Sequence, residues 1–422
     1  MKPFISVSLL SIFIAGLAIP SYFLPQQKPG QFFSFGQDAA VVSLDIPDTS
    51  YIFFDKEELA SKNKEFLFAL DRYILRQREE KSRLTEARSE NAKGIYITNS
   101  IATSNSFYAI WLRKEIENLL KETELNSVVI DVKEMAGPNL TPLLKGLVNG
   151  YRLNGYWTIA RIAVFRDCSL VDKHKDWYIQ NINGEPWRDF NGGCWLDPGL
   201  PDVFKYIFSV AKLAIDFGFD EIQFDYIRFP SDGDLQNMNH NVSNKADTIK
   251  EFSLRLYQEV KNEKPEIILS ADLFGYIATQ LNAFDIGQRM TDFASTFDYV
   301  SFMLYPSHFY GGFYIGADKK RGLPPLSLPY ENTATSTVVS ANPKEVVYRS
   351  VVSAIDYISA VGAKAKVRPW LQGFNLKFDL ERGIVYGAET VRAQIEAAEN
   401  ASSSGWLIWN SANAYSKEAF LP

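Results

Sequence analysis

The sequence contains few of the residues that bind transition metals. It has only 2 cysteines and 3 histidines in 422 residues, with no Cys-x-x-Cys or His-x-x-x-His spacing. Structural zinc sites need several such ligands close together, so we predict no metal centre, and we predict no organic cofactor. The two cysteines, Cys168 and Cys194, bracket one loop. They can form a disulfide in an oxidising compartment, whereas in the cytosol they would be two free thiols.

Clustered positive charge is also scarce. The net charge is -6 and no long run of Lys or Arg occurs, which argues against a nucleic-acid partner because phosphate binding requires clustered cations. A neutral or polar substrate fits this charge better. An apolar share of 46% with 22% charged residues is typical of a soluble globular protein. The aromatic share of 14% is generous, and aromatic faces stack on sugar rings, although most of these rings are expected in the core.

The amino terminus has the pattern of an export signal. Lys2 precedes a mainly apolar stretch of about 20 residues, so we predict a signal peptide or an uncleaved membrane anchor over 1–25. The protein would then be anchored facing the extracytoplasmic side, or secreted if the signal is cleaved. Residues 26–91 indicate a connector with a short apolar strand pattern and a charged helix over 56–88.

From residue 92 onward, short β-branched apolar runs alternate with amphipathic patterns, as in parallel α/β folds. No Gly-x-Gly-x-x-Gly turn follows the first run. Eight units in one stretch favour a closed (β/α)8 TIM barrel over 92–422, rather than an open doubly wound sheet. The predicted strands are 94–98, 127–132, 157–165, 221–226, 267–274, 299–305, 366–373 and 406–410, with helical patterns at 109–122, 203–217, 249–261, 344–361 and 389–401.

Long loops follow the third, fourth and sixth predicted strands, at 166–201, 230–245 and 306–343. All three leave the carboxyl ends of strands, where barrel enzymes place their active sites. Period-two alternation on the fourth strand predicts that Gln223 and Asp225 point into the barrel, because the opposite face must be apolar to pack against helices.

Two strand-end carboxylates are the catalytic candidates. Asp225 ends the fourth strand and Asp272 lies near the end of the fifth. Glycoside hydrolysis needs one protonated and one ionised carboxyl group. We expect Arg161 or Arg228 to hold Asp225 ionised, and an aromatic surround to raise the pKa of Asp272. Asp131 ends the second strand, and an alternative is that it forms, with Arg161 and Asp225, an interior charge network that only organises the barrel.

Other strand-end residues suggest a sugar site. Tyr305 and His308 follow the sixth strand, Trp370 lies on the seventh and Trp409 ends the eighth. Aromatic rings at such positions can stack on sugars. His308 is equally consistent with a hydrogen bond to substrate and with a loop residue held by backbone contacts.

Several motifs carry a family resemblance. They are Lys-Gly-Ile-Tyr-Ile-Thr at 93–98, Val-Val-Ile-Asp-Val-Lys at 128–133, Ile-Ala-Arg-Ile-Ala-Val-Phe-Arg-Asp at 159–167, Trp-Leu-Asp-Pro at 195–198, Phe-Asp-Glu-Ile-Gln-Phe-Asp-Tyr-Ile-Arg-Phe-Pro at 219–230, Ser-Ala-Asp-Leu-Phe-Gly at 270–275 and Tyr-Pro-Ser-His at 305–308. With these motifs the chain resembles a bacterial barrel family described as a glycosyl hydrolase domain, one of the domain-of-unknown-function families. The resemblance implies the barrel fold and a glycosidase activity.

The arrangement is also similar to the α-amylase and α-galactosidase clans, in which an aspartate ending the fourth strand is the nucleophile. This likeness implies that Asp225 is the nucleophile. The general acid departs from both patterns: the first clan has a Glu after the fifth strand, where this chain has Asp272, and the second uses a later strand.

The sequence therefore predicts a glycosidase that acts on an extracellular or cell-envelope polysaccharide through Asp225 and Asp272, with the membrane as a partner of the amino terminus. Two other classes compete with it: a non-catalytic carbohydrate-binding barrel, and an envelope scaffold whose barrel mouth is closed by the long loops. The predicted substrate-binding residues are Asp131, Arg161, Arg228, Tyr305, His308, Trp370 and Trp409.

Overall fold

The structure is a computed structural model that describes residues 39–42, 52–240, 242–281, 285–331 and 334–422. It contains two compact units, Met1–Gln77 and Arg78–Pro422. The predicted signal or anchor over 1–25 lies outside the described residues. Within the described part of the chain, no helix combines the length and the apolar character needed to cross a membrane.

The first unit contains two short strands and the beginning of a long helix. Strands β1 (Ala39–Val42) and β2 (Ile52–Asp55) pair antiparallel, and α2 (Lys56–Ser89) follows directly. The predicted charged helix over 56–88 is confirmed. The last turns of α2 belong to the second unit, in which Ser89 is buried.

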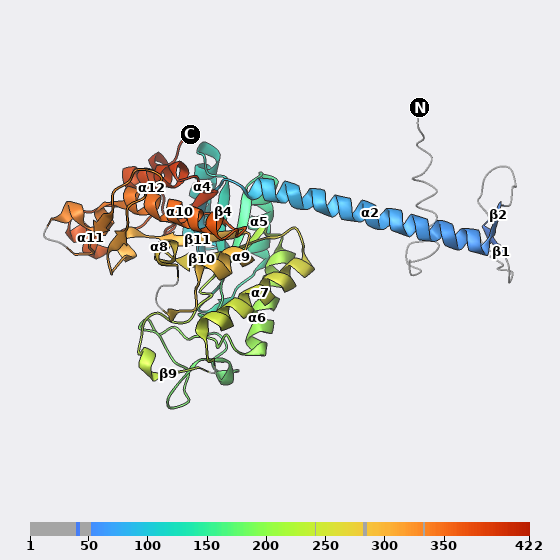
Figure 1. The fold of residues 1–422 in the computed structure, drawn as a ribbon, viewed down its shortest axis with the longest axis horizontal. Coiled ribbons are helices and arrows are strands. Elements are labelled where there is room, and N and C mark those ends of the chain that lie inside the picture. The colour runs from blue at the N-terminus through green and yellow to red at the C-terminus, as the bar shows by residue number, and fades with distance from the viewer. Residues whose placement is uncertain (1–38, 43–51, 241, 282–284, 332–333) are drawn as a thin grey trace. The chain divides into compact units, whose positions relative to one another are not determined.

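The second unit is a closed barrel of eight parallel strands, as predicted (Figure 1). Each strand pairs in parallel with its neighbours, and β16 pairs with β3 to close the sheet. Pro369 separates the seventh strand into two pieces, β14 and β15. The barrel strands are β3 (Ala92–Ile97), β4 (Ser127–Glu134), β6 (Trp157–Ala163), β8 (Glu221–Asp225), β10 (Ile268–Phe274), β11 (Tyr299–Leu304), β14 (Lys366–Val367) with β15 (Trp370–Gln372), and β16 (Gly405–Trp409).

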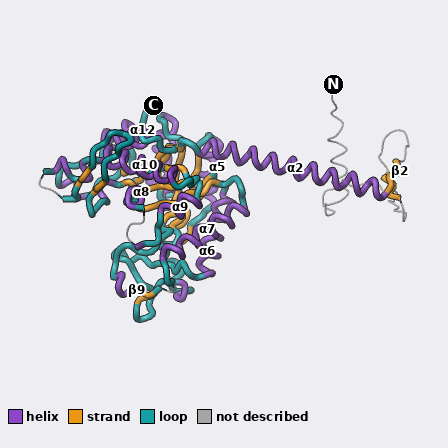
Figure 2. Tube along the Cα trace, viewed as in Figure 1, coloured by secondary structure: helices purple, strands orange, loops and turns teal. Residues whose placement is uncertain are grey.

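Helices surround the strands (Figure 2). Several begin where the sequence supplies a start signal: proline stands in the first turn of α5, α6 and α10, and the side chains of Ser106 and Asn244 cap α4 and α7. The helices are α3 (Asn99–Thr103), α4 (Phe107–Glu122), α5 (Pro142–Leu153), α6 (Pro201–Phe217), α7 (Lys245–Glu263), α8 (Ile277–Gln280), α9 (Met290–Thr296), α10 (Pro343–Ala360), α11 (Lys377–Glu381) and α12 (Ala388–Asn400).

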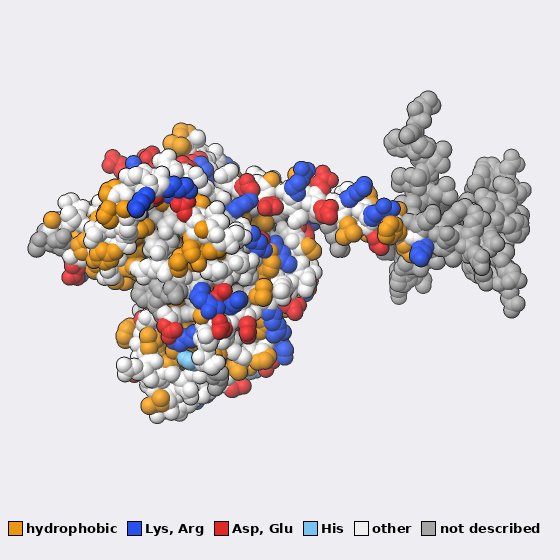
Figure 3. All heavy atoms as spheres, viewed as in Figure 1, with side chains coloured by type: hydrophobic (Ala, Val, Ile, Leu, Met, Phe, Trp, Pro, Cys, Tyr) orange, Lys and Arg blue, Asp and Glu red, His pale blue; other side chains and the backbone are white. Residues whose placement is uncertain are grey.

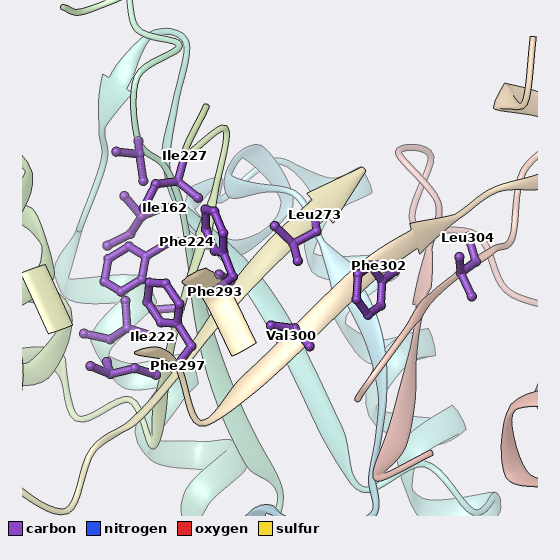
Figure 4. Close-up of a cluster of buried hydrophobic side chains, with 14 of the residues drawn as sticks. Ile162, Ile222, Phe224, Ile227, Leu273, Phe293, Phe297, Val300, Phe302 and Leu304 are labelled. Carbon is purple, nitrogen blue, oxygen red and sulfur yellow. The ribbon is translucent and has the colours of Figure 1, made fainter. Parts of the chain in front are cut away.

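The main core lies between the outer face of the barrel and the helices. Figure 4 shows Ile222 and Phe224 of β8 in this layer beside Phe293 and Phe297 from the α9 region. The alternation predicted for the fourth strand is therefore confirmed, because Glu221, Gln223 and Asp225 take the inner face. On the face of the molecule seen in Figure 3, acidic and basic side chains are interspersed.

The three long loops carry short elements of their own. The loop after β6 and the loop after β8 pair through β7 (Gln180–Asn181) and β9 (Met238–Asn239). A disulfide joins Cys168 to Cys194 within the first of these loops, with a Cα–Cα distance of 4.9 Å. The remaining short strands are β5 (Gly137–Pro138), β12 (Phe313–Ile315) and β13 (Leu326–Leu328).

Candidate active site

A cavity of about 480 Å³ opens at the carboxyl ends of the barrel strands. The long loops therefore leave the barrel mouth open, which contradicts the closed mouth expected of a scaffold. The cavity brings together residues from six barrel strands and the loops that follow them. Eight of the nine predicted site residues line it: Arg161, Asp225, Arg228, Asp272, Tyr305, His308, Trp370 and Trp409.

Asp225, the last residue of β8, is held by an arginine from the neighbouring strand. The Nε atom of Arg161 donates to Asp225 Oδ2 at 3.1 Å, and Nη2 donates to the same oxygen. Asp225 Oδ1 accepts the backbone N–H of Tyr226 at 2.5 Å. Both oxygens of the Asp225 carboxylate are therefore engaged, and the charge-assisted bonds from Arg161 fix its orientation.

Asp131 lies behind Arg161 and does not line the cavity. It is fully buried, and its Oδ1 accepts Arg161 Nη1 at 2.5 Å while its Oδ2 accepts the hydroxyl of Tyr96. Burial alone would lower the pKa of Arg161, but the charges of Asp131 and Asp225 outweigh it and raise that pKa well above its usual range. Asp131 therefore positions Arg161, and it is not a direct wall of the site.

Asp272, on β10, has a different environment from Asp225. Its Oδ1 accepts Trp370 Nε1 at 2.8 Å, whereas its Oδ2 has no hydrogen-bond partner and lies 3.7 Å from Arg161 Nε. Burial, followed by the negative charge of Asp225, raises the pKa of Asp272 well above its usual range. Burial and the neighbouring charge therefore favour the protonated form of the Asp272 carboxyl group.

Aromatic rings form one wall of the cavity. Trp409 packs against Tyr305 with ring centroids 5.9 Å apart and against Phe374 at 5.1 Å. His308 packs edge-on against Tyr305 at 5.6 Å. Burial lowers the pKa of His308, which favours the neutral form of its imidazole.

Comparison with known proteins identifies the family of this chain. A family model described as "Putative glycosyl hydrolase domain" matches residues 94–415. The chain belongs to this glycosyl hydrolase family. That is the family indicated by the motifs of the sequence, and membership makes the chain a glycosidase at the level of the family. Among curated proteins, no match was found.

Solved structures similar to the glycosyl hydrolase barrel include a hypothetical protein from Ruminiclostridium thermocellum, 30% identical, with a TM-score of 0.36; the match covers 42% of this chain and 96% of that one. An α-galactosidase from Thermus thermophilus is 13% identical with a TM-score of 0.47, covering 80% of this chain and 64% of that one. A GH36 α-galactosidase from Geobacillus stearothermophilus is 12% identical with a TM-score of 0.45, covering 78% and 40%.

Several cavity residues of this family member were missed from the sequence. Tyr226 has a positive φ of 50°, and Gly275 leaves no room for a side chain, since a Cβ there would lie 2.4 Å from the Met303 carbonyl oxygen. The only sequence signal for these residues was that they directly follow predicted strands. Aromatic residues at such positions cannot be distinguished from core residues by sequence alone. The missed lining residues are Tyr226, Ser231, Asp232, Phe274, Gly275, Tyr276, Met303, Phe309, Tyr310 and Gly311.

A further carboxyl group that the sequence did not single out lies beside this site. Burial, and then the charge of Asp131, raises the pKa of Glu134 to about 7. Within the described ranges, no group of three or more His, Cys, Asp or Glu side chains is arranged to hold a metal ion.

Proposed function

We propose that this chain hydrolyses a glycosidic bond in an extracellular or cell-envelope polysaccharide, with Asp225 as the nucleophile and Asp272 as the general acid and base. One observation carries the proposal: two carboxyl groups on adjacent strands share a cavity but have opposite environments. Arg161 holds Asp225 by two hydrogen bonds, whereas Asp272 is buried and its Oδ2 has no hydrogen-bond partner. Glycosidases need this division between an ionised and a protonated carboxyl group.

The spacing of the two carboxyl groups supports a retaining mechanism. Asp225 Oδ2 lies 3.1 Å and Asp272 Oδ2 lies 3.7 Å from the same atom, Arg161 Nε. The two oxygens therefore lie no more than about 7 Å apart. This limit includes the spacing of about 5 to 5.5 Å found in retaining enzymes and excludes most of the range of about 6.5 to 9.5 Å found in inverting enzymes.

In the first step, Asp272 donates its proton to the leaving glycosidic oxygen while Asp225 Oδ1 or Oδ2 bonds to the anomeric carbon and the glycosidic bond breaks. In the second step, Asp272 takes a proton from water, whose oxygen bonds to the anomeric carbon and releases Asp225. Arg161 keeps its charge throughout. Trp370 is a positioning residue in this scheme, because its N–H fixes Asp272 Oδ1 and leaves Oδ2 for the proton.

The proposed location rests on two features. The apolar amino-terminal stretch predicts export, with membrane attachment if it is not cleaved. The Cys168–Cys194 disulfide supports an oxidising compartment, since disulfides are rare in the reducing cytosol.

The test is release of reducing ends from a panel of envelope and storage polysaccharides by the full-length chain, Asp225→Asn and Asp272→Asn. Asp202→Asn is the matched control, because Asp202 is an exposed aspartate on α6 paired with Lys205. We expect wild type and Asp202→Asn to release reducing ends and both site variants to fail. Glycan binding without turnover by all four proteins would instead identify a carbohydrate-binding barrel.

A further inference from the structure

Arg228 is a buried cation that lines the cavity without an acidic partner. It follows β8 by three residues and is 6% exposed. Its Nη1 donates to the carbonyl oxygen of Phe229 at 2.9 Å and approaches Ser231 Oγ at 3.4 Å, while its Nε has no acceptor. Within the described ranges, no carboxylate forms an ion pair with it.

Two other arginines, Arg161 of the same cavity and Arg166, differ from Arg228 in this respect. Arg161 contacts three carboxylates, and Arg166 donates to Asp189 at 2.8 Å. Asp225 is engaged by Arg161, and Asp232, which also lines the cavity, is exposed to solvent. The negative charges around Arg228 are therefore either committed elsewhere or screened by water.

Three aromatic rings surround the guanidinium of Arg228. Its central carbon lies 4.3 Å from the ring centre of Phe274, 5.1 Å from Trp195 and 5.2 Å from Tyr226. Ring faces attract a cation but provide no hydrogen-bond acceptors for its N–H groups. Burying a charge is unfavourable unless an opposite charge approaches, and burial here lowers the pKa of Arg228.

We infer that Arg228 binds the carboxylate of an acidic sugar, so that the substrate is a glycan containing uronic acid residues. This inference rests on the proposed function and specifies its substrate class. A guanidinium with free N–H groups matches a carboxylate by charge and by its planar fork. An acidic substrate departs from the neutral or polar substrate expected from the net charge of -6, because a net charge does not describe a single cavity.

The inference is tested on matched polymer pairs that differ only in the acidic group. Polygalacturonate, polyglucuronate and alginate are each compared with the neutral polymer obtained by reducing their carboxyl groups. The proteins are wild type, Arg228→Gln, Arg228→Lys and the control Arg255→Gln. Arg255 lies over the Phe204 ring at 3.8 Å and borders a different cavity, so its loss removes an arginine–ring contact elsewhere. Thermal melts check that every variant is folded.

We expect wild type to cleave at least one acidic polymer about 100-fold more efficiently than its neutral partner. Arg228→Gln should abolish this preference by lowering kcat/KM for the acidic polymer alone, Arg228→Lys should retain part of it, and Arg255→Gln should match wild type. Equal loss on acidic and neutral polymers would overturn the inference, since Arg228 would then bind neutral sugar hydroxyls or only support the fold.

Binding separates failure of this inference from failure of the proposed function. Calorimetry with full-length Asp225→Asn and trigalacturonate or triglucuronate, beside their carboxyl-reduced forms, needs no turnover. Binding of an acidic oligosaccharide that disappears in Asp225→Asn with Arg228→Gln supports the acid site even if no polymer is cut. Cleavage of neutral polymers that is lost in Asp225→Asn but unchanged in Arg228→Gln would keep the glycosidase and remove the acid site.

Discussion

Each end of the barrel buries an arginine, and the two arginines differ in their hydrogen-bond and ion-pair partners. At the amino end of the strands, Arg368 is fully buried and bonds to both oxygens of Glu221, at 2.9 and 2.8 Å. Its Nη2 donates to the Ser89 carbonyl oxygen at 2.8 Å and its Nε to that of Ser404 at 3.3 Å. At the mouth, Arg228 forms no ion pair with any residue that the structure describes, and its Nε has no acceptor.

Both carboxylate oxygens of Glu221 also accept further hydrogen bonds. Its Oε1 also accepts Ser270 Oγ at 2.6 Å and its Oε2 accepts Trp157 Nε1 at 2.9 Å. Asp225 lies four residues farther along the same strand, and on the adjacent strand Asp272 Oδ2 has no hydrogen-bond partner. At the amino end of the strands, a fully hydrogen-bonded network stabilises the fold. At the carboxyl end, polar groups keep unused hydrogen-bonding capacity, and this is the end at which barrel enzymes bind substrate.

The largest expected effect is at the mouth. Asp225→Ala should lower kcat by about a thousandfold or more, because it removes the group that bonds to the anomeric carbon. Azide is small enough to occupy the vacated space and should restore turnover of an activated aryl glycoside, giving a glycosyl azide of inverted configuration that NMR identifies. Asp202→Ala is the control. Retained activity in Asp225→Ala without azide would contradict the assignment.

Replacing each buried arginine by methionine tests the difference between the two ends directly. Arg368→Met leaves Glu221 buried and unpaired, so the free energy of unfolding should fall by about 3 to 5 kcal/mol. Arg228→Met removes a cation that has no acidic partner, and the change should be less than about 1 kcal/mol or stabilising. Urea titrations of the two variants measure both values. Equal losses would show that the two sites have the same structural role.

The local sequence pattern was sufficient to predict the barrel, but not to predict which charged side chains pair inside it. The eight strands follow from β-branched runs and alternation within a few residues, as in β8, where Ile222 and Phe224 face the helices. Helix α5 was not singled out, because Gly146 and Gly150 weaken its helical propensity. The strand-end positions of Asp225 and Asp272 were visible for the same local reason.

The partners depend on contacts between residues far apart in the chain. Arg161 is 64 residues from Asp225, Trp370 is 98 residues from Asp272, and Arg368 is 147 residues from Glu221. Only the register of the closed sheet brings them together, so the sequence could offer Arg161 and Arg228 as equal partners of Asp225 but could not choose. The structure assigns Asp225 to Arg161 and leaves Arg228 free for another role.

Removal of the disulfide should have an intermediate effect on stability, confined to the mouth of the barrel. Cys168 and Cys194 are 26 residues apart, so closing this loop stabilises the folded state by about 3 kcal/mol in the loop-entropy model. Replacing both cysteines by serine should lower the melting temperature and raise KM, since the same loop supplies Trp195 beside Arg228. Hydrogen exchange should increase in the loop and stay unchanged around Glu221. Unchanged stability would show that the loop is held by its other contacts alone.

The smallest expected effect is the pH dependence set by Asp272. Its pKa is raised in the folded state by burial and by Asp225, so its contribution to stability is fully present below the unfolded pKa of about 3.9 and is lost as pH rises through the folded pKa. Asp272→Asn cannot ionise, and its side-chain oxygen can still accept the Trp370 N–H. Between the unfolded and the folded pKa of Asp272, the free energy of unfolding of the variant relative to wild type should therefore increase with pH. The increase should be up to about 1.4 kcal/mol per pH unit. Wild-type activity should fall as pH rises through the folded pKa of Asp272, because the general acid must be protonated. Parallel pH profiles of stability for the two proteins would show that Asp272 is ionised in the folded state and would remove it as the acid.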